Sequence, residues 1–433
     1  MLQYKRGTQV RIDHLKLTNF TGFKSCEFTF HPNFNLLVGD NATGKTSVLD
    51  ALSIALDSWV LGIKGDEKGG GIDSDQVRIV PYPHQDSFSF EKQFPSRIEV
   101  CGLVGEQEFT WARELAREGG RTSTKEAKNV TNAAGEAAQK VRDNQDITLP
   151  IISSYGVERL WFQSTPRKSK KEGGARSLSL SRLDGYRNCN FFEIQETELL
   201  DWIRAQVSVG HQRKKETLAF GAMKNAIIDC VEGATDLYYD ERYRDVVVVM
   251  GQQNEQLFRN LSAGQRIMLT LVGELVKRAT TLNPQLGDEV LRKTPGVVLI
   301  DELDLHLHPT WQRRVIHDLR RTFPSIQFIA TTHSPQLIGE AKPEEIRVIS
   351  GGAVTIPSHS FGMDSNRILE EVMGAKPRNE DTEILLSNLA KSIDEENLDQ
   401  ARNQLQEVEN TLGQDSPEVT GANTLIHLLD STR

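Results

Sequence analysis

Residues 34–46 read FNLLVGDNATGKT, and this stretch decides the fold class. Its apolar start, 34–38, is typical of a strand that is buried in a parallel sheet. The glycines, lysine and threonine that follow fit the phosphate-loop pattern G-x4-G-K-T. Residues 46–60 then have the apolar spacing of a helix. A strand, a glycine-containing loop and a helix in this order predict an α/β protein with a phosphate-binding site.

The loop at 39–47 carries the groups that phosphate binding requires. Glycines allow its backbone to wrap closely around phosphates, so that amide groups point inward. Lys45 adds a positive charge for the outer phosphates, and the Thr46 hydroxyl is suited to hold Mg²⁺. A glycine-rich turn without a ligand is the alternative, which the surrounding strand and helix disfavour. The residues expected to bind ATP are Gly39, Asp40, Asn41, Ala42, Thr43, Gly44, Lys45, Thr46 and Ser47.

The sequence VVLIDE at 297–302 predicts a second buried strand, which ends in two acids. Ligands of α/β sheets bind at the carboxyl ends of the strands, so these acids are expected beside the phosphate loop. Asp301 is expected to contact Mg²⁺ through water, and Glu302 to orient or deprotonate the attacking water. Two acids after a strand can also form a solvated turn, but the phosphate loop favours the catalytic role.

Three histidines follow in the last part of this pattern. His333, in TTHSP, ends another predicted strand at the same edge and is expected to contact the terminal phosphate. A lone histidine is more often structural, which is the alternative. His306 and His308 lie close together in DLHLHP, but no third ligand accompanies them. Turn and packing roles are therefore favoured over a metal site for this pair.

The segment LSAGQ at 261–265 is expected to open a helix, with Ser262 as the N-cap. The start of a helix exposes amide groups and the positive end of the helix dipole, which suits a phosphate. An ordinary capped helix is the alternative.

These motifs together resemble a known family. GDNATGKT, LSAGQ, IDELD and TTH, in this order, resemble the ABC-type ATPase heads. IDHLKLTNFTGF and DELDLHLHP resemble the RecF/SMC-like and OLD-like branch rather than transporters. YGVERLW, SRLDGYRNC, PTWQRRVI and FGMDSNRIL are similar to the PtuA-type ATPases of Septu and retron anti-phage defence systems. The likeness extends from about residue 10 to residue 375.

The resemblance implies that LSAGQ acts on the nucleotide of a second chain. In ABC-type heads this segment caps the ATP that is held by the phosphate loop of the partner. We therefore expect a homodimer with two sandwiched ATP molecules and Mg²⁺, or a higher homo-oligomer. Asp304 is expected at that interface as the D-loop residue. The expected trans signature residues are Ser262, Ala263, Gly264 and Gln265.

The resemblance also implies a partner, because PtuA-type proteins act with a small HNH endonuclease, PtuB. This chain would then be a slow ATPase that serves as sensor and scaffold, and it would reach DNA only through the complex. A RecF/SMC-like repair or recombination ATPase that acts directly on DNA is the alternative. The SMC-like opening argues against a transporter motor, and the intact Glu302 argues against a non-hydrolysing scaffold.

The residue pattern and the resemblance together divide the chain into four parts. They are an N-terminal ATPase lobe at 1–156, a helical insertion lobe at 157–260, a C-terminal ATPase lobe at 261–360 and an acidic helical tail at 361–433. One departure concerns the glutamine that ABC heads carry after the first lobe. The strand LPIISSYG ends without one, and Gln163 is the nearest.

Composition and charge set the remaining expectations. The tail holds 15 acidic and 6 basic residues, so it accounts for the whole net charge of −9. The basic run RKSKK at 167–171, with Arg176 and Arg182, is either a DNA contact or a solvated loop. No run of eighteen apolar residues and no secretory leader is visible, and the four cysteines are isolated. A cytoplasmic protein with reduced thiols and no membrane partner is expected.

Overall fold

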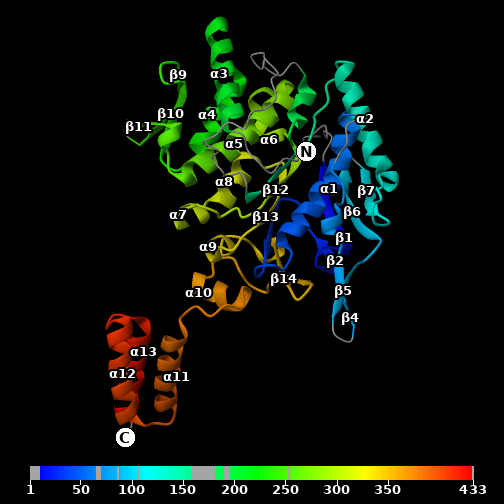
Figure 1. Cartoon of the computed structure of the whole chain (residues 1–433). Helices are drawn as coiled ribbons and strands as arrows, with labels where there is room; N and C mark the ends of the chain where they lie inside the picture. Colours follow the sequence, from blue (N-terminus) through cyan, green and yellow to red (C-terminus); the bar gives the residue numbers. More distant parts are fainter. Residues whose placement is uncertain are drawn as a thin grey trace, which may run out of the picture. The chain divides into compact units, whose positions relative to one another are not determined.

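The computed structural model describes residues 10–64, 70–84, 87–105, 107–157, 181–189, 196–251 and 254–431 of the chain. The chain forms two units, Met1–Ile368 and Leu369–Arg433. The two units are described separately, with the labels of Figure 1.

A six-stranded sheet with the order β15-β14-β3-β13-β12-β8 forms the centre of the first unit (Figure 1). All neighbouring strands pair in parallel except β14 and β15. Every residue of β3, β8, β12 and β13 is buried, which explains why these segments are nearly continuous apolar runs. The α/β fold class is thus confirmed. The strands are β3 (Phe34–Val38), β8 (Ile151–Tyr155), β12 (Gly296–Ile300), β13 (Ile326–Thr331), β14 (Ile346–Ser350) and β15 (Ala353–Thr355).

The strand order brings distant motifs to one edge of this sheet. β13 lies between β3, which precedes the phosphate loop, and β12, which precedes the two acids. Thr331 of β13 pairs with Leu37 of β3, and Ala330 pairs with Ile300 of β12. The carboxyl ends of three strands therefore lie side by side.

A second sheet, with the order β2-β1-β6-β7, is antiparallel throughout. The helix α1 (Lys45–Lys64) contacts β12 and β13 of the central sheet and also β1, β6 and β7. Residues Lys45–Ile63 are long and apolar enough to cross a membrane, but 72% of this window is buried inside the protein. We therefore identify α1 as a core helix, onto which α2 (Lys128–Arg142) also packs. The strands are β1 (Val10–Phe20), β2 (Phe23–Thr29), β6 (Ser96–Val104) and β7 (Gln107–Leu115).

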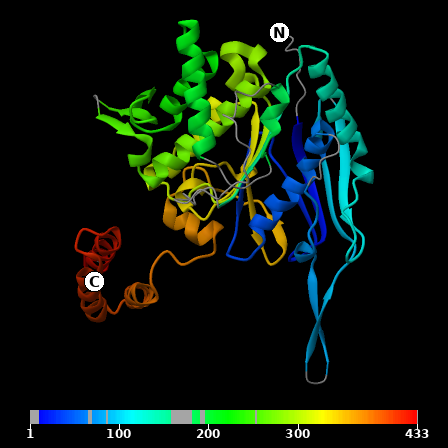
Figure 2. The ribbon, with the colours of Figure 1, turned by 45° about the horizontal axis from the view of Figure 1, so that its top comes forward.

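A separate two-stranded ribbon consists of β4 (Ile79–Pro83) and β5 (Phe88–Lys92). Figure 2 shows it extending away from the body of the first unit. Its base is tied to the turn between β1 and β2, because the Thr21 amide donates to the Gln76 carbonyl at 2.6 Å. The exposed side chains of the ribbon include large apolar groups.

The range expected as a helical insertion lobe, 157–260, contains strands as well as helices. Its helices are α3 (Glu196–Arg213) and α4 (Leu218–Cys230). A three-stranded sheet follows, with β9 (Ala234–Asp240), β10 (Asp245–Met250) and β11 (Asn254–Leu257) in the order β11-β10-β9. α5 (Ala263–Leu282) packs against α3 and α4. The short helices of the first unit are α6 (Val290–Lys293), α7 (Pro309–Gln312), α8 (Val315–Thr322), α9 (Pro335–Ile338) and α10 (Ser365–Arg367).

The segment 181–189 is fixed against α5 by a buried guanidinium group. Arg278 of α5 donates hydrogen bonds to three backbone carbonyl groups of the segment. They belong to Gly185, Arg187 and Asn188, at 2.8, 3.0 and 3.2 Å. The charge of Arg278 therefore remains solvated by peptide dipoles although the side chain is buried.

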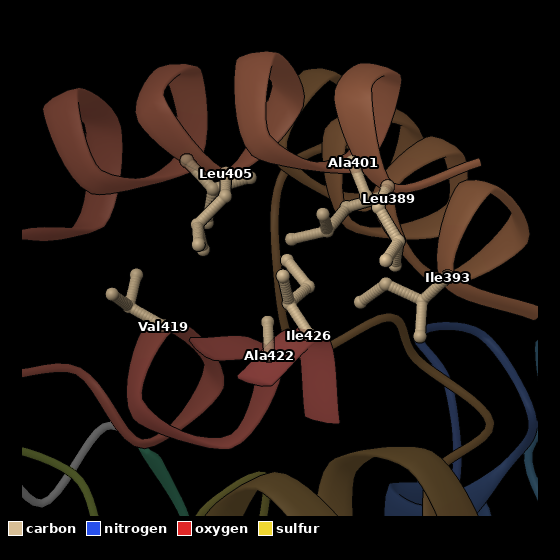
Figure 3. Packing of buried hydrophobic residues seen from close by; sticks show 9 residues of the cluster. Leu389, Ile393, Ala401, Leu405, Val419, Ala422 and Ile426 are labelled. Carbon is tan, nitrogen blue, oxygen red and sulfur yellow. The ribbon is translucent and has the colours of Figure 1, made fainter. Parts of the chain in front are cut away.

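The second unit contains most of a short π-helical segment, Ile368–Val372, and three α-helices, each of 15 residues: α11 (Glu380–Asp394), α12 (Leu398–Leu412) and α13 (Pro417–Ser431). The unit begins at Leu369, whereas the acidic tail was expected from 361. Apolar residues at helical spacing form one small core, and Figure 3 shows their side chains pointing toward one another. The core residues are Leu389, Ile393, Leu398, Ala401, Leu405, Val408, Val419, Ala422 and Ile426.

Candidate nucleotide-binding site

The phosphate loop joins β3 to α1 and depends on its second glycine. Gly44 has a φ of 95°, a conformation that side chains other than glycine rarely adopt. A Cβ atom at this position would also lie 2.6 Å from the ring of Phe23. Ala42 has a positive φ of 64° as well, so the loop turns sharply before the helix begins. The backbone can therefore approach a phosphate closely.

Lys45 lies inside this loop and is almost completely buried. Its Nζ donates hydrogen bonds to the carbonyl oxygens of Gly39 and Asp40, both at 2.8 Å. Burial lowers the pKa of the Lys45 ammonium, while Asp301, Asp40 and Glu302 act against this shift. A buried ammonium whose hydrogen bonds go to backbone carbonyls of the loop is chemically suited to an anionic ligand such as phosphate.

A hydrogen-bonded chain links the phosphate loop to the acids after β12. The Thr46 hydroxyl donates to Asp301 Oδ2 at 3.0 Å, and the Thr331 hydroxyl donates to Asp301 Oδ1 at 2.5 Å. The Thr331 oxygen in turn accepts the Glu302 amide at 2.7 Å. Hydroxyl and carboxylate oxygens are the ligands that Mg²⁺ prefers, so Thr46 and Asp301 fit this cation chemically.

Glu302 has a φ of 48°, in the left-handed region that glycine favours. Such a conformation costs free energy in a residue with a side chain, and it persists only where the surroundings fix it. The bond from the Glu302 amide to Thr331 is one such restraint. The turn directs the chain away from β12 immediately after Asp301, at the edge where the phosphate loop lies.

Asp304 and His333 are also brought together. Asp304 Oδ1 accepts the Thr332 hydroxyl at 2.6 Å and the His333 amide at 3.4 Å. The loop that follows the acids is thus connected to the end of β13. His333 lies at the expected edge of the sheet, and its contact with a terminal phosphate stays a prediction.

Asp50 is a member of this site that the sequence reasoning missed. It lies one turn after Thr46 on α1, and four-residue spacing places two residues on the same helix face. Burial and the negative charge of Asp301 raise the pKa of Asp50 from 3.8 to about 6. The two carboxyl groups therefore create an excess of negative potential that a divalent cation can neutralise.

The LSAGQ segment begins α5 as expected. Ser262 is the N-cap, its Oγ accepts the Gln265 amide at 3.4 Å, and Gln265 Oε1 accepts the Ser262 amide at 3.0 Å. A Cβ atom on Gly264 would lie 2.7 Å from the His306 carbonyl oxygen, so only glycine fits there. Ser262 and Ala263 are exposed. Within the described residues, no hydrogen bond joins this segment to the phosphate loop of the same chain.

Several other expectations concern polar residues outside this edge. His308 caps α7, since its Nδ1 accepts the Thr310 amide at 3.4 Å. Arg182 donates to the backbone carbonyls of Leu282 and Ile147, so its guanidinium has a structural role, and a DNA contact is not favoured for this one residue. The run 167–171, Arg176 and Gln163 lie outside the described residues.

The fold and the site fit a phosphate-loop ATPase, and comparisons with known proteins support this class. An AAA domain model matches residues 14–226. A second AAA domain model, whose description names an AbiEii toxin of a type IV toxin–antitoxin system, matches residues 225–339.

Two relatives match most of the chain. The Septu protein PtuA of Bacillus thuringiensis is 28% identical over 408 residues, which cover 89% of this chain and 90% of that protein. The Retron Vc95 probable ATPase of Vibrio cholerae is 24% identical over 402 residues, with 79% and 74% covered. The chain is thus similar over most of its length to PtuA and to a retron ATPase, in line with the resemblance that the motifs indicated. The SMC head domain from Thermotoga maritima superposes with a TM-score of 0.44 at 15% identity, over 80% of this chain and 98% of that chain.

Proposed function

We propose that this chain is the ATP-binding and ATP-hydrolysing subunit of a bacterial anti-phage defence complex. The observation that carries the ATPase role is the hydrogen-bonded chain from Thr46 through Asp301 and Thr331 to Glu302. It joins the phosphate loop to the acid that would act on water. The similarity to PtuA of Septu and to a retron ATPase supports the defence role.

Each residue of the edge has a role in this proposal. Lys45 and the loop amides bind the phosphates, and their positive groups offset the charge that accumulates during phosphoryl transfer. Thr46 and Asp301 hold Mg²⁺, which supplies charge neutralisation when bound. Glu302 orients the attacking water and accepts its proton, and His333 contacts the terminal phosphate. Hydrolysis yields ADP and inorganic phosphate.

The exposed start of α5 is proposed to act on a second chain. Ser262, Ala263, Gly264 and Gln265 cap the nucleotide of the partner, and Asp304 lies near the resulting interface. Two ATP molecules are then sandwiched in a homodimer, which is the minimum homo-oligomer. ATP at a hundred times its dissociation constant favours the closed dimer by about 2.7 kcal/mol per site. Slow turnover keeps this closed form populated.

The nuclease of the complex is proposed to be a separate chain. A small HNH endonuclease of the PtuB type would cut DNA, and this chain would regulate it as sensor and scaffold in the cytoplasm. A tagged chain purified from cells with its native locus should retain this partner in a fixed ratio, as measured by mass spectrometry. Recovery of bound DNA without a nuclease would instead support a RecF/SMC-like repair ATPase.

The nucleotide site itself is tested by Lys45→Ala. Binding of a fluorescent ATP analogue with Mg²⁺ should weaken by at least about tenfold, because a buried charge partner of the phosphates is removed. Lys24→Ala is the matched control, since Lys24 is an exposed lysine on β2. Equal affinity of the two variants for the ATP analogue would show that the phosphate loop does not bind the nucleotide.

A further inference from the structure

The ribbon of β4 and β5 has two outer edges. Hydrogen bonds at its ends show which residues direct their backbone N–H and C=O groups toward these edges. The His84 amide donates to the Ser87 carbonyl at 2.7 Å. The Gln93 amide donates to the Arg78 carbonyl at 2.8 Å. In an antiparallel pair, the backbone groups of successive residues point alternately to the partner strand and to the outer edge. Together with the pairing of β4 and β5, these two bonds therefore show which residues point to the outer edge. The outward-facing residues are Ile79, Pro81 and Pro83 in β4, and Phe88, Phe90 and Lys92 in β5.

Proline makes these two edges different. Pro81 and Pro83 lack an amide hydrogen at outward positions, so the edge of β4 cannot pair fully with another strand. β5 contains no proline, and in the described part of the chain β4 is its only neighbour. Phe88 and Phe90 are 66% and 71% exposed. Proline protects many natural edge strands from further pairing, and β5 lacks it, so its aromatic edge remains open to another strand.

We propose that β5 pairs with β5 of a second copy of this chain, antiparallel about a two-fold axis at Phe90. In this register Phe90 lies opposite the second copy's Phe90, and Phe88 lies opposite the second copy's Lys92. The outward N–H and C=O groups then form about six inter-strand hydrogen bonds. The Lys92 ammonium donates to Ser74 and lies 3.7 Å from Glu118 of its own chain, and no like charges lie opposite each other in the pair. The edge is therefore self-complementary, as a two-fold interface requires.

The charge of the ribbon favours a protein partner over nucleic acid. Residues 78–93 contain two basic and two acidic residues, so they have no net charge. A ribbon that enters a DNA groove needs an excess of positive charge to meet the phosphates. The proposed pairing also uses neither LSAGQ nor the phosphate loop, so it is a contact separate from the nucleotide sandwich and does not require ATP.

Cross-linking tests the register. Phe90→Cys is prepared in a Cys101→Ser background, because the other three cysteines are buried. Without nucleotide, a short bis-maleimide should give at least about five times more covalent dimer than Ile79→Cys, which places the thiol on the blocked edge. The same ratio is expected when Lys45→Ala is added, since the contact does not depend on ATP.

A proline substitution tests the hydrogen bonds. Phe90→Pro removes an outward amide without removing a β4–β5 bond, and should weaken self-association by at least about tenfold in sedimentation equilibrium. Ile79→Pro at the blocked edge should leave it unchanged. A wild-type chain that is monomeric without nucleotide, or equal cross-linking of the two cysteines, would overturn the pairing. ATP-analogue binding measured on the same samples shows whether the nucleotide site remains intact, so failure of this contact is distinguishable from failure of the proposed function.

Discussion

Asp50 provides a quantitative test of the electrostatics at the nucleotide-binding edge. Its pKa is raised from 3.8 to about 6, because burial disfavours the charged form and Asp301 repels it. The folded state therefore binds this proton more tightly than the unfolded state. The contribution of Asp50 to stability then falls as the pH rises from about 4 to about 6, and above about 6 its cost is complete. Two pKa units correspond to about 3 kcal/mol, and the partial exposure of Asp50 reduces this cost to about 1–3 kcal/mol.

The substitution Asp50→Asn removes the charge with little change in shape. Without nucleotide and Mg²⁺, it should raise the free energy of unfolding by about 1–3 kcal/mol at pH 8, and by less than about 1 kcal/mol at pH 4. Urea unfolding followed by tryptophan fluorescence measures both values. Asp75→Asn is the control at an exposed position and should change stability by less than about 0.5 kcal/mol at either pH. An equal gain at pH 4 and pH 8, or a loss at pH 8, would refute the reasoning.

Three further substitutions test other parts of the chain. Glu302→Gln keeps the shape of the side chain but cannot accept a proton, so phosphate release should fall by about a hundredfold or more while ATP stays bound. Normal turnover of this variant would show that Glu302 has no catalytic role. Leu405→Ala should cost the second unit about 2–4 kcal/mol and lower its melting temperature without affecting ATP binding, whereas Leu428→Ala at an exposed position should have little effect. Arg278→Met leaves three carbonyl groups without their donor and should destabilise the first unit by about 3 kcal/mol in urea unfolding; an unchanged midpoint would contradict this role.

The strand–loop–helix around the phosphate loop was predictable because its signals are local. Continuous apolar residues indicated β3, β12 and β13, and Ser262 indicated the N-cap of α5, which the structure confirms. The proximity of Asp301 and Glu302 to the phosphate loop was predictable from one rule, because the carboxyl ends of parallel strands lie at the same edge of a sheet. Their functional roles stay predictions.

Other features depend on pairing between distant residues, which one sequence does not reveal. Thr331 is an ordinary strand residue in the sequence, yet it bridges Asp301 and Glu302. The influence of Asp301 on Asp50 likewise depends on the packing of α1 onto the central sheet. The strands β9 and β11 interrupt their apolar residues with polar ones, so only β10 had a clear apolar signal.

The distribution of charge between the two units limits how this chain could attract DNA. Residues 369–433 contain 14 acidic and 5 basic residues, and their net charge of −9 equals that of the whole chain. The first unit therefore has no net charge and cannot attract a polyanion over a long range, while the second unit repels one. Arg182, a candidate for a phosphate contact, is occupied by backbone carbonyls. Under the proposed function, DNA contact would come from a local basic segment or from another protein. This requirement agrees with a complex in which a separate chain contacts and cuts DNA.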